Sequence, residues 1–169
     1  MTSCLSCSPS ELAARLQAGE AAILPTDTLP ALASRPEAAN LLWELKERPR
    51  HKPVILMAAR GDTLLQCLGR AIEPAWEHMA DRYWPGALTL VLPAQGTWLE
   101  QLNPGGTTLG LRLPACQAAL ELLALSGPLA TTSANRSGEP ACLDHREAAE
   151  RFPHVGQLGP VPWPAPSGQ

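Results

Sequence analysis

The sequence has few aromatic residues and no long apolar run. Aromatics make up only 4% of the 169 residues, whereas hydrophobic residues together make up 45%. We therefore expect a core of leucine, alanine, valine and isoleucine. No stretch approaches the roughly 18 consecutive apolar residues of a membrane span, and the N-terminus lacks the basic segment and apolar run of a signal peptide. These absences predict a cytoplasmic protein without a membrane partner.

Cysteine is too scattered for a disulfide framework. The count of five is odd, and we expect free thiols in a reducing compartment. Cys4 and Cys7 form a CxxC pair, but Cys67, Cys116 and Cys142 stand alone. A structural zinc site normally needs four ligands, so we predict no metal-ligand residues of the protein's own.

Two common catalytic signatures are also missing. There is no GxxxxGK[ST] loop, so the chain is not a P-loop protein. No histidine stands in an arrangement that suggests a Ser-His-Asp triad. The formal net charge of -3 argues against an obligate coat of nucleic acid, although a local basic face can still contact RNA.

A basic cluster stands out against this mildly acidic background. Residues 45–57 read LKERPRHKPVILM, and the seven residues 46–52 hold five basic side chains before an apolar run begins. Arginine offers a planar fork of donors and lysine a compact charge, and both match phosphate oxygens. The alternative is a solvated basic turn at the end of a helix. This stretch alone does not decide between the two.

The order of the predicted elements indicates an α/β domain. Capping boxes at 8–11 and 34–37 predict helix starts, and a strand, a helix and a strand follow one another between residues 21 and 57. We predict strands at 21–24, 54–57, 87–92, 108–113 and 128–132, and helices after residues 8 and 34 and at 62–68, 73–81, 116–125 and 144–152. Residues 93–107 are predicted as a loop. The prediction is one domain over 1–169, with an irregular proline-rich tail from about residue 153.

Polar residues collect on these strands or at their ends. In open α/β sheets, ligands bind at the carboxyl ends of strands. The sets are Thr26 to Thr28, the basic cluster, Thr108 with Arg112, Thr131 to Ser133, and Asn135 with Ser137. For residues 26–28 the alternative is ordinary turn chemistry. Residues alone therefore predict an anion-binding α/β domain, with a nucleotide enzyme as one option.

Five stretches, in order, resemble the YrdC/Sua5 family of threonylcarbamoyladenylate synthases, in its single-domain TsaC type. They are LPTDT at 24–28, LKERPRHKPVILM at 45–57, RYWPGALTLVLPA at 82–94, TTLGLRLPA at 107–115 and GPLATTSANRSGEPA at 127–141. The resemblance implies an open, twisted mixed α/β sheet with flanking helices and a large concave cleft.

The resemblance also implies a reaction and partners. L-threonine, bicarbonate and ATP with Mg²⁺ would give threonylcarbamoyl-adenylate and pyrophosphate. Partner proteins of the TsaD, TsaB and TsaE type would then transfer the threonylcarbamoyl group to the adenosine beside the anticodon of tRNA. Members of the family are also described as binding double-stranded RNA.

Site residues are carried over motif by motif. The family's KxR motif falls on Lys46 and Arg48 and its SxN motif on Ser133 and Asn135, which implies that these four are the catalytic set. The implied ATP contacts are Arg48, Lys52, Thr108 and Ser133, and the implied threonine contacts are Thr28, Arg112 and Thr131.

The sequence departs from the family pattern in four places. Leu29 to Ala33 replaces the usual Val-Tyr-Gly-Leu-Gly, the segment from Thr28 to Lys46 is a few residues shorter than usual, and Ala141 stands where many members have a serine that contacts ATP. The sequence ends at Gln169, where members continue with a Ser-Thr-Val/Ile strand and a late arginine. Two explanations for the missing strand and arginine are a truncated chain and a short, divergent paralogue. The second hypothesis is thus a non-catalytic paralogue that binds nucleotide or double-stranded RNA, associated with translation or the ribosome.

Overall fold

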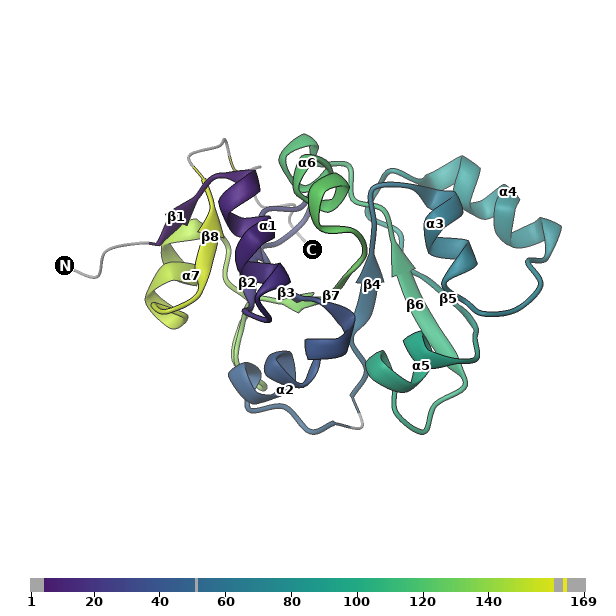
Figure 1. Cartoon of the computed structure of the whole chain (residues 1–169), viewed down its shortest axis with the longest axis horizontal. Coiled ribbons are helices and arrows are strands. Elements are labelled where there is room, and N and C mark those ends of the chain that lie inside the picture. The colour runs from purple at the N-terminus through teal and green to yellow at the C-terminus, as the bar shows by residue number, and fades with distance from the viewer. Residues whose placement is uncertain (1–4, 51, 160–162, 164–169) are drawn as a thin grey trace.

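A computed structural model describes residues 5–50, 52–159 and 163 (Figure 1). Within these residues the chain forms one eight-stranded mixed sheet in the order β1-β8-β2-β3-β7-β4-β6-β5. The strands are β1 (Ser6–Cys7), β2 (Ala22–Leu24), β3 (Ala31–Ser34), β4 (Ile55–Met57), β5 (Leu90–Pro93), β6 (Thr108–Arg112), β7 (Leu129–Ser133) and β8 (Gly156–Leu158). The predicted open mixed sheet is confirmed, whereas the concave cleft stays a prediction.

Helices flank this sheet on both sides. They are α1 (Pro9–Gln17), the 3₁₀ helix η1 (Pro36–Ala38), α2 (Asn40–Lys46), α3 (Gly61–Gln66), α4 (Pro74–Tyr83), α5 (Thr97–Leu102), α6 (Gln117–Ser126) and α7 (His145–Arg151). None of the helices in the described ranges is long and apolar enough to cross a membrane.

The first predicted capping box is confirmed and the second is wrong. Ser8 caps α1, with Glu11 N donating to its hydroxyl at 3.2 Å and its own N donating to the Glu11 carboxylate at 2.9 Å. Ser34 instead ends β3, where it pairs with Ala130 of β7, and its hydroxyl donates to Arg35 O at 3.0 Å. Strand pairing therefore outweighs the local helix-start signal at Ser34.

The predicted strand–helix–strand unit is also revised. Between β2 and β4 lie β3 and β7, all joined by antiparallel pairing at these positions. All four β3 residues are buried, so this strand shows no alternation of polar and apolar positions that could identify it. It occupies most of the Leu29 to Ala33 segment in which the chain departs from the family pattern.

Short elements account for the other misses. Helix α5 lies in the predicted loop at 93–107, and β8 lies in the predicted irregular tail after residue 153. Strand β8 forms because Gln157 and Leu158 pair in parallel with β1, and Gly156 and Gln157 with β2. Strands β1 and β2 are both far from β8 in the sequence, so no local sequence pattern indicates β8.

The core is divided by the sheet into two layers. On one face, α1 and α6 pack together over Leu24, Ala33 and Leu129, and Figure 1 shows these two helices side by side. On the other face, the buried residues include Leu32, Leu56 and many positions of the remaining helices. The predicted aliphatic core is confirmed, with Trp43, Trp84 and Phe152 as buried aromatic additions.

Candidate functional site

Lys46 lies at the end of α2 and reaches the end of β7. The residue is only 2% exposed, and its Nζ donates to Ser133 O at 2.6 Å and to Asn135 Oδ1 at 2.9 Å, with Ser133 Oγ farther away at 3.4 Å. Its backbone carbonyl accepts from Ser137 N at 2.7 Å. Lys46 of the KxR motif thus forms one hydrogen-bonded cluster with both residues of the SxN motif, although 87 positions separate Lys46 from Ser133.

Asn135 organises this cluster. Its Oδ1 accepts from Lys46 and also from Ser133 Oγ at 2.6 Å, while its Nδ2 donates to the carbonyls of Arg136 and Glu139, both at 2.9 Å. Both ends of the amide are therefore occupied within the protein. The geometry makes Asn135 a residue that positions the side chains of Lys46 and Ser133.

Burial changes the acid–base behaviour of Lys46. Loss of hydration disfavours the ammonium, and the positive charge of Arg48 disfavours it further, so the pKa of Lys46 falls from 10.5 to about 8. A nearby Cys142 opposes this change to a lesser degree. An anion bound beside Lys46 would favour the charged form again.

Arg48 is held beside the same strand. Its Nη1 donates to Thr132 Oγ1 at 3.0 Å and its Nη2 to Pro53 O at 2.9 Å. Its Nε is buried and finds no acceptor within the described residues, and burial lowers the pKa of the guanidinium. The two cations of the KxR motif thus approach consecutive residues of β7.

A second cluster surrounds Arg112 at the end of β6. Its Nη2 donates to Asp27 Oδ1 at 2.6 Å and to Thr28 Oγ1 at 3.1 Å, and its Nε contacts Gly86 O at 3.4 Å. The loop after β2 is held by the buried Thr26, whose hydroxyl donates to the Leu29 carbonyl at 2.8 Å and accepts from Thr28 N at 3.0 Å.

The register places four predicted residues on one face of the sheet. Thr131 pairs with Ile55, and Arg112 pairs with Met57 two positions further along β4. Because paired residues and alternate residues of a strand share a face, Thr131 and Arg112 point to the same side, and so do Ser133 and Thr108. Thr131 Oγ1 is buried there without a partner in the described chain.

Two predicted ATP contacts are not drawn into either cluster. Lys52 is exposed and is held through its backbone, with its carbonyl accepting from Trp43 Nε1 at 2.8 Å and its N donating to Pro49 O at 3.1 Å. Thr108 is half-buried at the start of β6 and likewise uses its carbonyl, which accepts from Asn103 Nδ2 at 2.8 Å. Their proposed ligand roles stay predictions. His51, Cys4 and therefore the CxxC prediction lie outside the described residues.

Two contacting residues belong to the predicted polar sets but carry no predicted ligand role. Asp27, for which ordinary turn chemistry is the alternative, forms an ion pair with Arg112. Thr132 anchors Arg48 but has no distinctive sequence signal. For Asp27 a signal existed, since an acidic residue beside a strand-end threonine can meet a cation that follows another strand.

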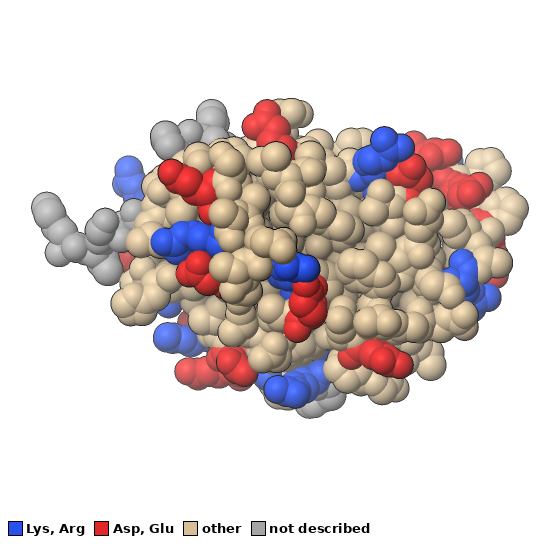
Figure 2. All heavy atoms as spheres, viewed as in Figure 1, with Lys and Arg blue, Asp and Glu red and all other residues tan. Residues whose placement is uncertain are grey.

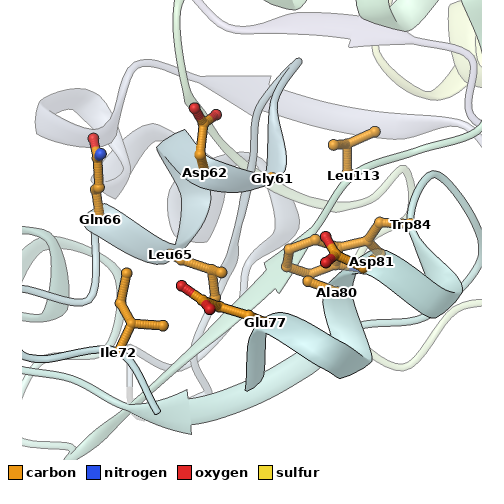
Figure 3. Close-up of a pocket in the computed structure, with 10 residues that line it drawn as sticks. All are labelled: Gly61, Asp62, Leu65, Gln66, Ile72, Glu77, Ala80, Asp81, Trp84 and Leu113. Atoms are coloured by element: carbon orange, nitrogen blue, oxygen red, sulfur yellow. The ribbon is translucent and has the colours of Figure 1, made fainter. Parts of the chain in front are cut away.

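A separate cavity of about 550 Å³ lies between α3 and α4. Figure 3 shows its apolar lining, including Leu65 and Trp84, and the carboxylates of Asp62, Glu77 and Asp81 on the bordering helices. None of the predicted ligand residues lines it. On the face shown in Figure 2, positive and negative side chains are interspersed, without an extended area of one sign.

Comparisons with known proteins agree on one family. The family model for Sua5, YciO and YrdC, described as "Telomere recombination", matches residues 14–158. The threonylcarbamoyl-AMP synthase of Pyrococcus abyssi is 35% identical over 141 residues, which cover 81% of this chain and 41% of that protein. The enzyme of the same name from Bacillus subtilis is 37% identical over 137 residues, covering 78% of this chain and 39% of that protein.

A solved structure gives the same result at the level of the fold. Pyrococcus abyssi Sua5 complexed with L-threonine aligns with a TM-score of 0.84 at 30% identity, covering 94% of this chain and 48% of that one. The chain thus spans about two fifths of the length of the first two curated relatives and about half of this structure.

Proposed function

The chain belongs to the Sua5/YciO/YrdC family, and we propose that it forms threonylcarbamoyl-AMP from L-threonine, bicarbonate and ATP. One observation carries the proposal. Lys46 and the SxN residues Ser133 and Asn135 form a single cluster, and Arg48 is anchored beside it. The names of the two synthases support the same activity.

The proposed chemistry brings anions together. The threonine amine combines with bicarbonate to give a carbamate with loss of water, and a carbamate oxygen then attacks the α-phosphorus of ATP. The bond between the α-phosphorus and its bridging oxygen breaks, and pyrophosphate leaves. The attack brings the negative carbamate close to the negative phosphates of ATP. Cations that are already held in place, and need no reorganisation, therefore lower the barrier of this reaction.

Lys46 and Arg48 are suited to this task. An ammonium has three donors, and two of those of Lys46 are held by Ser133 O and Asn135 Oδ1. The 3.4 Å contact to Ser133 Oγ is the weak one, so a phosphate or carbamate oxygen can replace it. Arg48 adds a second cation, which Thr132 Oγ1 and Pro53 O hold beside the same strand.

We assign L-threonine to the Arg112 cluster, with Thr28 and Thr131 on the same side. Mg²⁺ would enter as the MgATP complex, since phosphate oxygens are its usual ligands in such sites. No group of three or more potential metal-ligating side chains occurs in the described ranges. The adenylate is a reactive mixed anhydride, so we propose that tRNA-modifying partners consume it in the cytoplasm.

Mass spectrometry of the products tests the proposal. The protein is incubated with L-threonine, bicarbonate and MgATP, with Arg48→Ala as the test variant and Arg50→Ala, at an exposed position of the same segment, as the matched control. We expect a threonylcarbamoyl-adenylate peak from the parent and from Arg50→Ala, and its loss in Arg48→Ala. No peak from folded parent protein that binds ATP would overturn the proposed activity.

A further inference from the structure

The Arg112–Asp27 ion pair is placed differently from the other ion pairs of the chain. The side chains of Arg112 and Asp27 are 11% and 16% exposed, whereas those of the Arg60–Asp62 pair are 74% and 58% exposed. Burying a pair of charges gains little stability on its own. The pair nevertheless keeps some accessible surface, so it lies at the edge of the site and a ligand can reach it.

Both members of the pair have unused polar atoms. A guanidinium carries five N–H donors, and Arg112 uses Nη2 for Asp27 and Thr28 and Nε for Gly86. Within the described residues no hydrogen bond is made by its Nη1, nor by Oδ2 of Asp27. A free cationic donor and a free anionic acceptor therefore lie on adjoining groups.

Such a pair is complementary to a zwitterion. An amino acid carries a carboxylate and an ammonium on one carbon atom, and the two can contact Arg112 and Asp27 together. We propose that Asp27 binds the α-ammonium of the amino-acid substrate, so that Asp27 and Arg112 jointly select a zwitterion. This inference rests on the proposed function, and it adds a specificity-determining residue to the threonine site.

The same geometry predicts what is rejected. A hydroxy acid that lacks the α-ammonium can still offer its carboxylate to Arg112. It would then place that carboxylate beside Asp27 with no positive charge to compensate, and the two anions repel each other. The loop that carries Asp27 cannot easily turn it away, because the buried Thr26 hydroxyl holds both Leu29 O and Thr28 N.

Calorimetric titration with two ligands tests this. The ligands are L-threonine and (R)-3-hydroxybutanoate, which keeps the carboxylate and the hydroxyl but has hydrogen in place of the ammonium. We expect the parent to prefer L-threonine by about tenfold or more, the usual effect of one charge-assisted contact. In Asp27→Asn that preference should disappear, because threonine binds more weakly while the hydroxy acid binds as well or better. Asp62→Asn, which alters the exposed pair, is the matched control and should leave both affinities unchanged.

Each contrary outcome has a distinct meaning. If Asp27→Asn weakens both ligands by one common factor, Asp27 only supports Arg112, and the inference is overturned. If Asp27→Asn does not fold, the affinities of the parent protein for the two ligands are the test. Equal affinity for L-threonine and the hydroxy acid refutes the selection of a zwitterion. A parent that binds no threonine and forms no adenylate overturns the proposed function itself.

Discussion

Removing the buried lysine should change how the stability of the protein depends on pH. The pKa of Lys46 is 10.5 in its ordinary state and about 8 in the folded protein. Between these two values the unfolded chain carries a proton that the folded chain lacks. The free energy of unfolding therefore rises with pH in this window, and Lys46→Met should abolish that rise.

The magnitude follows from the two pKa values. Each unit of difference corresponds to about 1.4 kcal/mol, and integration from pH 7 to pH 9.5 gives a gain of about 2 kcal/mol from Lys46. Other groups titrate as well. Burial raises the pKa of Cys67 to about 11, so this thiol acts in the opposite direction, losing its proton first in the unfolded chain. That contribution is common to parent and variant and cancels in their difference.

Urea denaturation at pH 7, 8, 9 and 9.5 measures this difference. We expect parent minus Lys46→Met to become more positive by about 2 kcal/mol across the series. Lys52→Met, which removes an exposed lysine from the same segment, controls for the loss of one positive charge. If the stability difference between parent and Lys46→Met changes by less than about 0.5 kcal/mol across the pH series, burial does not disfavour the charged form of Lys46, and the reasoning is refuted.

Two further substitutions test the threonine assignment and the packing of β6 against β4. Arg112→Ala should raise the KM for threonine in adenylate formation about tenfold or more, because it removes charge-assisted hydrogen bonds from the proposed threonine site. The KM for ATP should change less. Equal effects on both substrates in steady-state kinetics would reject that assignment. Gly110→Ala should destabilise the protein by about 1–3 kcal/mol in urea denaturation, since the added Cβ would lie 2.7 Å from Ile55 Cγ2. Combining it with Ile55→Ala should restore part of the lost stability. A Gly110→Ala variant as stable as the parent would show that the Ile55 side chain moves aside freely.

Features that depend on neighbours in sequence were predictable. The Ser8 to Glu11 capping box places the start of α1, because both hydrogen bonds join residues three positions apart. The alternation of Thr108 to Arg112 assigns the faces of β6 correctly. The motifs that resemble the family also marked the residues that meet around Lys46.

Features that depend on distant partners were not predictable. Strands β3 and β8 are short and entirely buried, and each exists because it pairs with strands from other parts of the chain. Asp27 and Arg112 are separated by 85 positions. The position of Asp27 at a strand end indicates that a cation can meet it, but nothing local identifies Arg112 as that cation.

The sequence by itself determined the fold class, the family and the chemistry of the side chains at the strand ends. Only the tertiary structure decided which of them meet. It turned the Asn135 amide inward to hold Lys46 and Ser133, paired Arg112 with Asp27, and left Lys52 exposed. The physical reason is that hydrogen-bond geometry and burial are properties of the packed chain. A motif specifies the side chain at a position, and the pairing of distant strands specifies its partner and its protonation.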